Sequence, residues 1–197
     1  MKDPRRIMHG IKIHRDTTWN YSFWYPSHWH RFDMDDQYGF IYAPEQDPRT
    51  GFHISAKDLS TILESPVTED DLPALREGVT AGLRQLPDCD IIYEKEIAKG
   101  YAIGFEVMLT FTLEEQTCKR LMRLLYNDRQ QFTLYGQGVP IAEYEVFHDT
   151  FDFIYLNFGF GDSLTSLGIR VPPSLTIEWQ GGSDDVETAP QNPRKHP

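Results

Sequence analysis

Residues 101–113 alternate apolar and other side chains without a break, and this pattern constrains the fold more than any other part of the chain. The apolar positions are Tyr101, Ile103, Phe105, Val107, Leu109, Phe111 and Leu113, and the positions between them are Ala102, Gly104, Glu106, Met108, Thr110 and Thr112. Successive side chains of a β-strand point to opposite faces of a sheet, so a period of two places all the apolar residues on one face. The segment predicts a long strand that is buried on one face and mostly in contact with water on the other.

Shorter segments on both sides of this strand carry a related signal. Asp90–Ile97 precedes it across a turn at residues 98–100, and Thr117–Tyr126 and Gln130–Gly136 follow it across short turns. Short connections between strands of similar length favour antiparallel neighbours. We therefore expect these four strands to form an antiparallel meander. The aromatic N-terminal part of the chain predicts four more strands, at Trp19–Tyr25, His28–Met34, Gly39–Ala43 and Gly51–Lys57.

Two segments have the period of an amphipathic helix. The first begins at Thr68, which can cap it, and ends near Gln85. Its apolar stripe consists of Leu72, Leu75, Val79 and Leu83. The second runs from Pro140 to Phe158, with apolar residues every three or four positions.

A sheet that is apolar on one face needs a cover, and two amphipathic helices supply one. The predicted fold class is therefore α+β, with an antiparallel sheet covered on one face by two helices. We place this single sandwich domain at residues 19–180, with an edge strand at Leu175–Trp179. Residues 1–18 are expected to form an N-terminal arm. Residues 181–197, rich in Gly, Pro, Asp and Glu, are expected to form a disordered tail.

The charge balance excludes some classes of partner. The chain has 30 acidic and 19 basic residues, and the resulting net charge of −11 at pH 7 repels phosphate backbones, so nucleic-acid binding is not expected. No stretch approaches the ~20 apolar residues of a membrane span, and no apolar run of signal-peptide length follows the basic start. Two cysteines, Cys89 and Cys118, are too few for a disulfide framework. These features predict a soluble cytoplasmic protein with reduced thiols.

The order of elements and several aromatic positions resemble the Mog1/PsbP/DcrB-like small α/β sandwiches. The typical opening of that family, Phe-x-x-Pro-x-x-Trp, is similar to residues 23–29, Phe-Trp-Tyr-Pro-Ser-His-Trp. The last helix of the family often closes on Ser-Phe, where this chain has Asn157-Phe158. The resemblance covers residues 19–160 and implies a non-catalytic role. Mog1 proteins engage a small GTPase, PsbP proteins support photosystem II, and DcrB-related cytosolic members act as chaperones for secreted effectors.

Several residues could indicate catalysis, and each has a simpler explanation. Gly161–Leu164 matches the Gly-Asp-Ser-Leu signature of a serine hydrolase family, but the only histidine after Ser163 lies in the polar tail. Because a nucleophilic serine needs a base held within hydrogen-bond reach, we interpret this tetrapeptide as a turn. Glu106 and Glu114 could form a carboxylate pair, yet solvated sheet positions account for both. We expect no catalytic residue and no cofactor.

Histidines offer a metal-binding alternative. His28 and His30 alternate, so their imidazoles would point in parallel from one strand, and His53 is a plausible third ligand. Histidines beside the solvated acidic turn of Asp35 and Asp36 explain the same pattern, so no bound metal is expected. A metal-dependent binder or enzyme built around His28, His30 and His53 is the alternative function.

The favoured function is protein binding. The even positions of the long strand form a weakly charged face that could stay solvated or accept an apolar or helical partner, and the acidic surface would attract a basic one. Trp24 and Trp29 lack obvious places in a core, and exposed tryptophans concentrate binding energy, although core burial is the favoured explanation for them. We therefore expect a non-enzymatic cytosolic chaperone or adaptor. Its expected partner-binding residues are Trp24, Trp29, Glu106, Met108 and Thr110.

Overall fold

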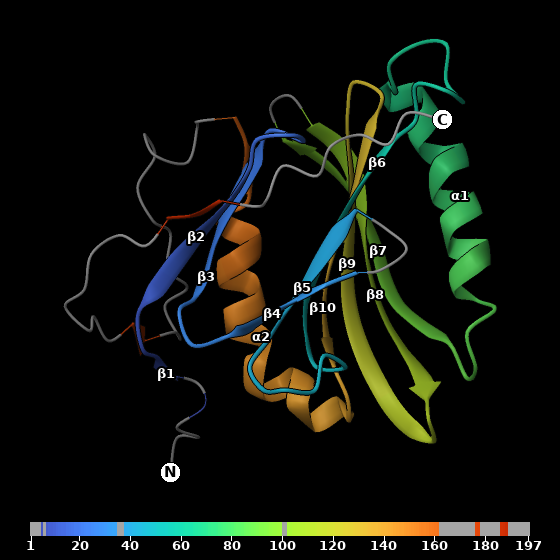
Figure 1. The fold of residues 1–197 in the computed structure, drawn as a ribbon. Coiled ribbons are helices and arrows are strands. Elements are labelled where there is room, and N and C mark those ends of the chain that lie inside the picture. Colours follow the sequence, from blue (N-terminus) through green and yellow to red (C-terminus); the bar gives the residue numbers. More distant parts are fainter. Residues whose placement is uncertain are drawn as a thin grey trace. The chain divides into compact units, whose positions relative to one another are not determined.

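The computed structural model describes residues 5, 7–34, 38–99, 102–161, 176–177 and 186–188 (Figure 1). The described residues form two compact units. One joins the residues up to Trp29 with those from Val146 onward, and the other is His30–Glu145. The predicted α+β class is confirmed, because the strands are mostly antiparallel and two α-helices accompany them. Within the described part of the chain, no helix combines the length and apolar character that a membrane crossing requires.

The unit His30–Glu145 is built on a seven-stranded sheet in the order β4-β5-β6-β10-β9-β8-β7. All neighbouring strands in it are antiparallel. The strands are β4 His30–Asp33, β5 Gly39–Ala43, β6 Gly51–Asp58, β7 Asp90–Lys99, β8 Ala102–Leu113, β9 Gln116–Asn127 and β10 Gln130–Gly138. Because β7 to β10 are consecutive neighbours, the predicted meander is confirmed.

Helix α1, Leu72–Leu83, lies on one face of this sheet, alongside β7 and β8 (Figure 1). We call this the helix face and the other the opposite face. Ahead of the helix, the Asp71 carboxylate accepts hydrogen bonds from the backbone N–H and the hydroxyl of Thr68, both at 2.8 Å. The predicted apolar stripe packs against fully buried residues of β8: Leu72, Leu75, Val79 and Leu83 contact the cluster that holds Phe105, Val107 and Leu109. That a second helix also covers this face remains a prediction.

The opposite face of β8 differs from the prediction. Ala102, Gly104 and Glu106 are buried, and only Met108, Thr110 and Thr112 keep part of their surface. At Gly104 an added Cβ would clash with the Leu124 carbonyl group of β9, so the two backbones approach closely there. The prediction of a mostly water-exposed face is therefore wrong for the first half of the strand.

The other unit contains a four-stranded sheet in the order β11-β3-β2-β13 and a short pair of β1 with β12. Strands β2 and β3 are antiparallel, whereas β13 runs parallel to β2. The elements are β1 Ile7–Met8, β2 Ile11–Asp16, β3 Tyr21–Pro26, β11 Gly159–Phe160, β12 Thr176–Ile177, β13 Val186–Thr188 and α2 Ile141–Leu156, which belongs to this unit from Val146 onward.

This unit corrects the expected chain ends. Residues 11–16, expected to lie in an arm, form β2, and residues 186–188, expected to lie in a disordered tail, form β13 beside it. The arm was misjudged because β2 buries two polar residues, His14 and Asp16, which hide its strand pattern. The Asp16 carboxylate accepts hydrogen bonds from the N–H groups of Thr18 and Trp19, each at 2.9 Å. That residues 19–180 fold as one domain stays a prediction.

The two faces of β8 can be told apart by one pair of substitutions. Phe105→Asp places an unpaired charge in a fully buried site and is expected to lower the free energy of unfolding by several kcal/mol, about 4 or more. Thr110→Asp lies on the half-buried part of the opposite face, in register with both Lys119 and Asp90, whose opposite charges offset each other. It is expected to change the free energy of unfolding by less than about 1 kcal/mol. Urea unfolding of both variants measures the difference, and equal losses would contradict the assignment of faces.

Candidate functional site

Three neighbouring strands bring four polar side chains together on the opposite face. Glu106 of β8 lies in register with Lys95 of β7 and Arg123 of β9. Its carboxylate accepts hydrogen bonds from Lys95 Nζ at 2.6 Å, from Arg123 Nε at 2.5 Å and from the Tyr93 hydroxyl at 2.9 Å. Only 1% of the Glu106 side chain is exposed, so these donors replace its water. The cluster joins β7, β8 and β9 through one buried carboxylate.

The protonation state of Glu106 follows from these contacts. Burial disfavours the charged carboxylate, but the hydrogen bonds and charges of Lys95 and Arg123, with the Tyr93 hydrogen bond, outweigh burial and hold its pKa below the ordinary value. A general acid at neutral pH needs a raised pKa instead. Glu114 binds elsewhere, to Arg49, so the two glutamates do not form a carboxylate pair. Glu106 is a buried structural anion, and its expected exposure to a partner is wrong.

An exposed surface adjoins this cluster at the end of the sheet. A β-bulge between Ile91 and Tyr93 leaves Ile92 52% exposed, and the Tyr93 side chain is 37% exposed. Tyr93 lies in register with Met108, and both Met108 and Thr110 are half-buried. We call Ile92, Tyr93, Lys95, Met108 and Thr110 the β7 edge surface. Two of the predicted binding residues, Met108 and Thr110, therefore lie beside apolar side chains that the sequence did not single out.

The two tryptophans occupy different environments. Trp29 is only 6% exposed, and its ring makes edge contacts with Phe147 and Phe151 at centroid distances of 5.9 and 6.0 Å. Aromatic packing in the core accounts for Trp29, as the favoured explanation from the sequence had it, so little of its surface is left for a partner. Trp24 lies on β3 and is half-buried. It keeps some surface for a partner.

The three histidines of the metal alternative do not form a shared site. His28 lies in a turn before β4 begins at His30, so the two do not alternate along one strand as expected. His30 contacts the Gln46 amide at 3.4 Å, and the His28 ring makes an edge contact with the His9 ring at a centroid distance of 6.1 Å. Among the described residues, no three His, Cys, Asp or Glu side chains are placed to hold a metal ion. Asp35 and Asp36 lie outside the described residues.

His53 belongs instead to a row of stacked planar groups on the helix face. Its ring stacks on Tyr135 at 4.2 Å, and the Arg120 guanidinium lies 4.2 Å from the Tyr135 ring and 4.8 Å from that of Phe111. Burial, together with the charge of Arg120, lowers the pKa of His53 to about 3. His53 is therefore neutral at physiological pH and packs as an aromatic residue. Sequence reasoning missed this row, although an arginine at an inward position between Cys118 and Met122 was a signal for it.

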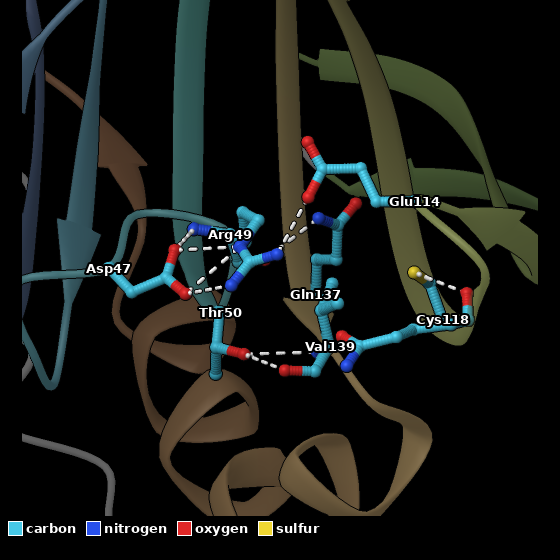
Figure 2. Close-up of polar contacts among 8 residues, drawn as sticks. Asp47, Arg49, Thr50, Glu114, Cys118, Gln137 and Val139 are labelled. Carbon is cyan, nitrogen blue, oxygen red and sulfur yellow. Dashed lines mark hydrogen bonds and ion pairs between the residues drawn. The ribbon is translucent and has the colours of Figure 1, made fainter.

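The loop between β5 and β6 is fastened by a second polar network (Figure 2). The Arg49 guanidinium forms ion pairs of 2.7 Å with both Asp47 and Glu114, and the Arg49 hydrogen bonds lower the pKa of Asp47. The Gln137 amide donates to the Arg49 carbonyl oxygen at 2.8 Å and accepts from Arg120 Nε at 2.9 Å. Figure 2 also shows the Thr50 hydroxyl bonded to the backbone of Val139. The network holds the loop against β10 and the β8–β9 turn.

The remaining candidates for chemistry show no activation. Cys89 and Cys118 are free thiols, and burial raises the pKa of both, which opposes the thiolate form that a nucleophile needs. Residues 162–164 of the Gly-Asp-Ser-Leu tetrapeptide lie outside the described residues.

Comparison with known proteins shows similarity of fold. No protein-family model matches the chain, and no curated protein matches its sequence.

The solution structure of cyanobacterial PsbP from Synechocystis sp. PCC 6803 is 11% identical, with a TM-score of 0.58 over 76% of this chain and 92% of that chain. LpqN of Mycobacterium tuberculosis, described as involved in cell envelope biogenesis, is 11% identical, with a TM-score of 0.50 over 78% of this chain and 92% of that chain. The Ran-binding protein Mog1p of Saccharomyces cerevisiae is 10% identical, with a TM-score of 0.48 over 79% and 98% of the two chains. The protein has a PsbP-like fold, and the resemblance read from the sequence is confirmed at that level.

Glu106 yields a pH-dependent prediction. Glu106→Gln is expected to lower the free energy of unfolding at pH 7 by about 2 kcal/mol, because Lys95 and Arg123 then face a neutral amide in a buried site. The pKa of the Glu106 carboxyl group is lower in the folded protein than in the unfolded chain, where it is about 4.3. Its charge therefore stabilises the fold above about pH 4.3, and this stabilisation is lost as the pH falls through the pKa of the folded state. Urea unfolding of the wild type and the variant at pH 7 and pH 3 measures this effect. The difference between their free energies of unfolding should be smaller at pH 3 than at pH 7.

The matched control is Glu64→Gln, at an exposed position in the loop before α1. It is expected to leave the free energy of unfolding unchanged at both pH values. A loss in Glu106→Gln that is equally large at pH 3 would show that the charge of Glu106 does not stabilise the fold.

Proposed function

We propose that this protein is a non-enzymatic protein-binding module, a cytosolic chaperone or adaptor, which holds its partner on the β7 edge surface. The observation that carries this proposal is the adjacent exposure of Ile92 and Tyr93 beside the half-buried Met108. Large apolar side chains exposed together mark interaction sites more often than single exposed residues do.

The Glu106 cluster prepares this surface for binding. The Tyr93 hydroxyl and Lys95 Nζ both donate to the buried Glu106 carboxylate, so two of the five surface residues are held from beneath. Side chains that are already ordered lose less conformational entropy when a partner binds, and tyrosine is a frequent source of interface binding energy. Met108, which lies in register with Tyr93, adds an adaptable apolar contact. Trp24, half-buried on β3, is proposed as a separate contact.

Two further features support this class of function. The candidate nucleophiles and acids described above have pKa shifts that oppose catalysis, at Cys89, Cys118 and Glu106. Cys118 on β9 and Cys89 just before β7 lie on opposite sides of β8, about 10 Å apart by strand spacing, which exceeds the reach of a disulfide. Two thiols that cannot pair with each other suit the reducing cytosol that we propose.

Site-specific photo-cross-linking tests the proposal. With a benzophenone amino acid at Thr110, irradiation in the source cells is expected to give one discrete adduct. Ile92→Asp should reduce this adduct about tenfold, because it places a charge in the apolar contact while leaving an exposed position folded. The matched control is Ile62→Asp, at a more exposed isoleucine of the loop before α1, which should leave the adduct unchanged. Equal loss in both variants, or no adduct from Thr110, would contradict the proposal.

A further inference from the structure

We propose that β7 receives the partner by β-strand addition, and that the added segment is basic. This inference rests on the proposed function and specifies how the partner binds. It concerns the backbone edge of β7, in addition to the side chains of the β7 edge surface.

The backbone of β7 is suited to this role. It is a ten-residue strand at the end of the seven-strand order, and within the described residues only β8 pairs with it. An edge strand presents a row of N–H and C=O groups that can pair with another chain. The segment 90–99 contains no proline, so its donors are intact along the whole edge. A partner segment of similar length could therefore extend the sheet.

The side chains at the bulge add an apolar anchor. The bulge between Ile91 and Tyr93 leaves Ile92 outside the regular register, with half of its surface exposed at the edge. A segment laid along β7 would cover Ile92 and the exposed part of Tyr93. Strand addition generally combines main-chain hydrogen bonds, which supply affinity, with pockets for alternate side chains, which supply specificity.

The charges of β7 indicate the composition of the added segment. On the helix face, Glu94 and Glu96 share one cation, Arg76 of α1, at 3.8 and 3.3 Å. Two more exposed carboxylates lie at this end of the strand, Asp88 just before it and Asp90 at its first residue, in register with Thr110 of the opposite face. Lysine or arginine at the facing positions would offset this excess of carboxylates. On the opposite face, Tyr93 and Lys95 suit apolar or small polar residues. The added segment therefore alternates basic residues with apolar or small ones.

The same charges disfavour a second copy of this chain as the occupant. Two copies pairing their β7 strands antiparallel about a two-fold axis bring residues of the same face opposite each other. A register centred on Glu94 or Glu96 pairs that glutamate with its own copy. A register centred on Lys95 pairs Lys95 with Lys95 and Glu94 with Glu96. Like charges directly opposite are destabilising, so the strand repels itself and accepts a basic partner.

Backbone-methylated peptides test strand addition directly. The probe is the blocked peptide Lys-Val-Lys-Thr-Lys-Val-Lys-Thr, titrated against the full chain and followed by amide NMR shifts and hydrogen exchange. In an added strand only alternate N–H groups face β7. N-methylation of one alternate set, either all lysines or all Val and Thr residues, is therefore expected to weaken binding about tenfold, while methylation of the other set has little effect. Amide exchange within 90–99 should slow. Equal binding of the parent and both methylated peptides, or slowed exchange only elsewhere, would overturn the inference.

Charge variants supply the second arm of the test. Replacing every lysine of the peptide with glutamate, or making Glu94→Gln with Glu96→Gln in the protein, is expected to weaken binding about fivefold or more. The matched control, Glu45→Gln with Glu64→Gln, removes the same number of charges at exposed loop positions away from β7 and should leave affinity unchanged. If both double variants weaken peptide binding equally, the net charge of the protein explains the effect, and the basic-segment assignment is overturned.

The two proposals fail in distinguishable ways. A Thr110 adduct that depends on Ile92, together with peptides insensitive to methylation, would keep the binding surface and exclude strand addition. Peptides that behave as expected, with no Thr110 adduct in cells, would support strand addition at β7 and contradict the proposed function.

Discussion

The carboxylate of Glu106 lies where the opposite face of the seven-stranded sheet changes from buried to exposed. Before it on β8, Ala102 and Gly104 are buried, and after it Met108 and Thr110 keep part of their surface. Its hydrogen bonds reach both neighbouring strands, through Lys95 of β7 and Arg123 of β9. Such a buried anion is tolerated only while its donors stay in place. The backbone ladder with β8 places β7, and this cluster orients the Tyr93 and Lys95 side chains of the candidate binding surface on it.

Elements that bury a regular apolar pattern could be predicted from the sequence. The odd positions of β8 and the stripe of α1 were found because residues such as Phe105 and Val79 recur at the period of their element. Strand β2 was missed because its buried residues include His14 and Asp16, which look like surface residues in a sequence. The environment of Glu106 was missed for a related reason. Its partners are distant in sequence, and a buried glutamate and a solvated one have the same pattern.

The candidate site was predicted in part. Met108 and Thr110 lie on the surface that the alternation indicated, but the apolar residues beside them depend on a bulge that shifts the register between Ile91 and Tyr93. A bulge adds one residue to one strand, and periodicity alone does not locate it. Burial of Trp29 was favoured but not decided from the sequence, because its packing partners, Phe147 and Phe151, come from a helix more than a hundred residues later. Long-range packing of this kind decides exposure, and a local pattern cannot.

A PsbP-like fold supplies a scaffold and does not itself specify a partner. Specificity must then come from features carried by particular residues of this chain. An edge strand with exposed Ile92 and Tyr93 would be a liability if it also paired with itself. The sequence Glu94-Lys95-Glu96 disfavours self-pairing, because its central symmetric registers place like charges opposite each other, while a segment of opposite charge meets no such repulsion. The same three residues thus separate self-association from partner binding, and they do so without any change in the apolar contact itself.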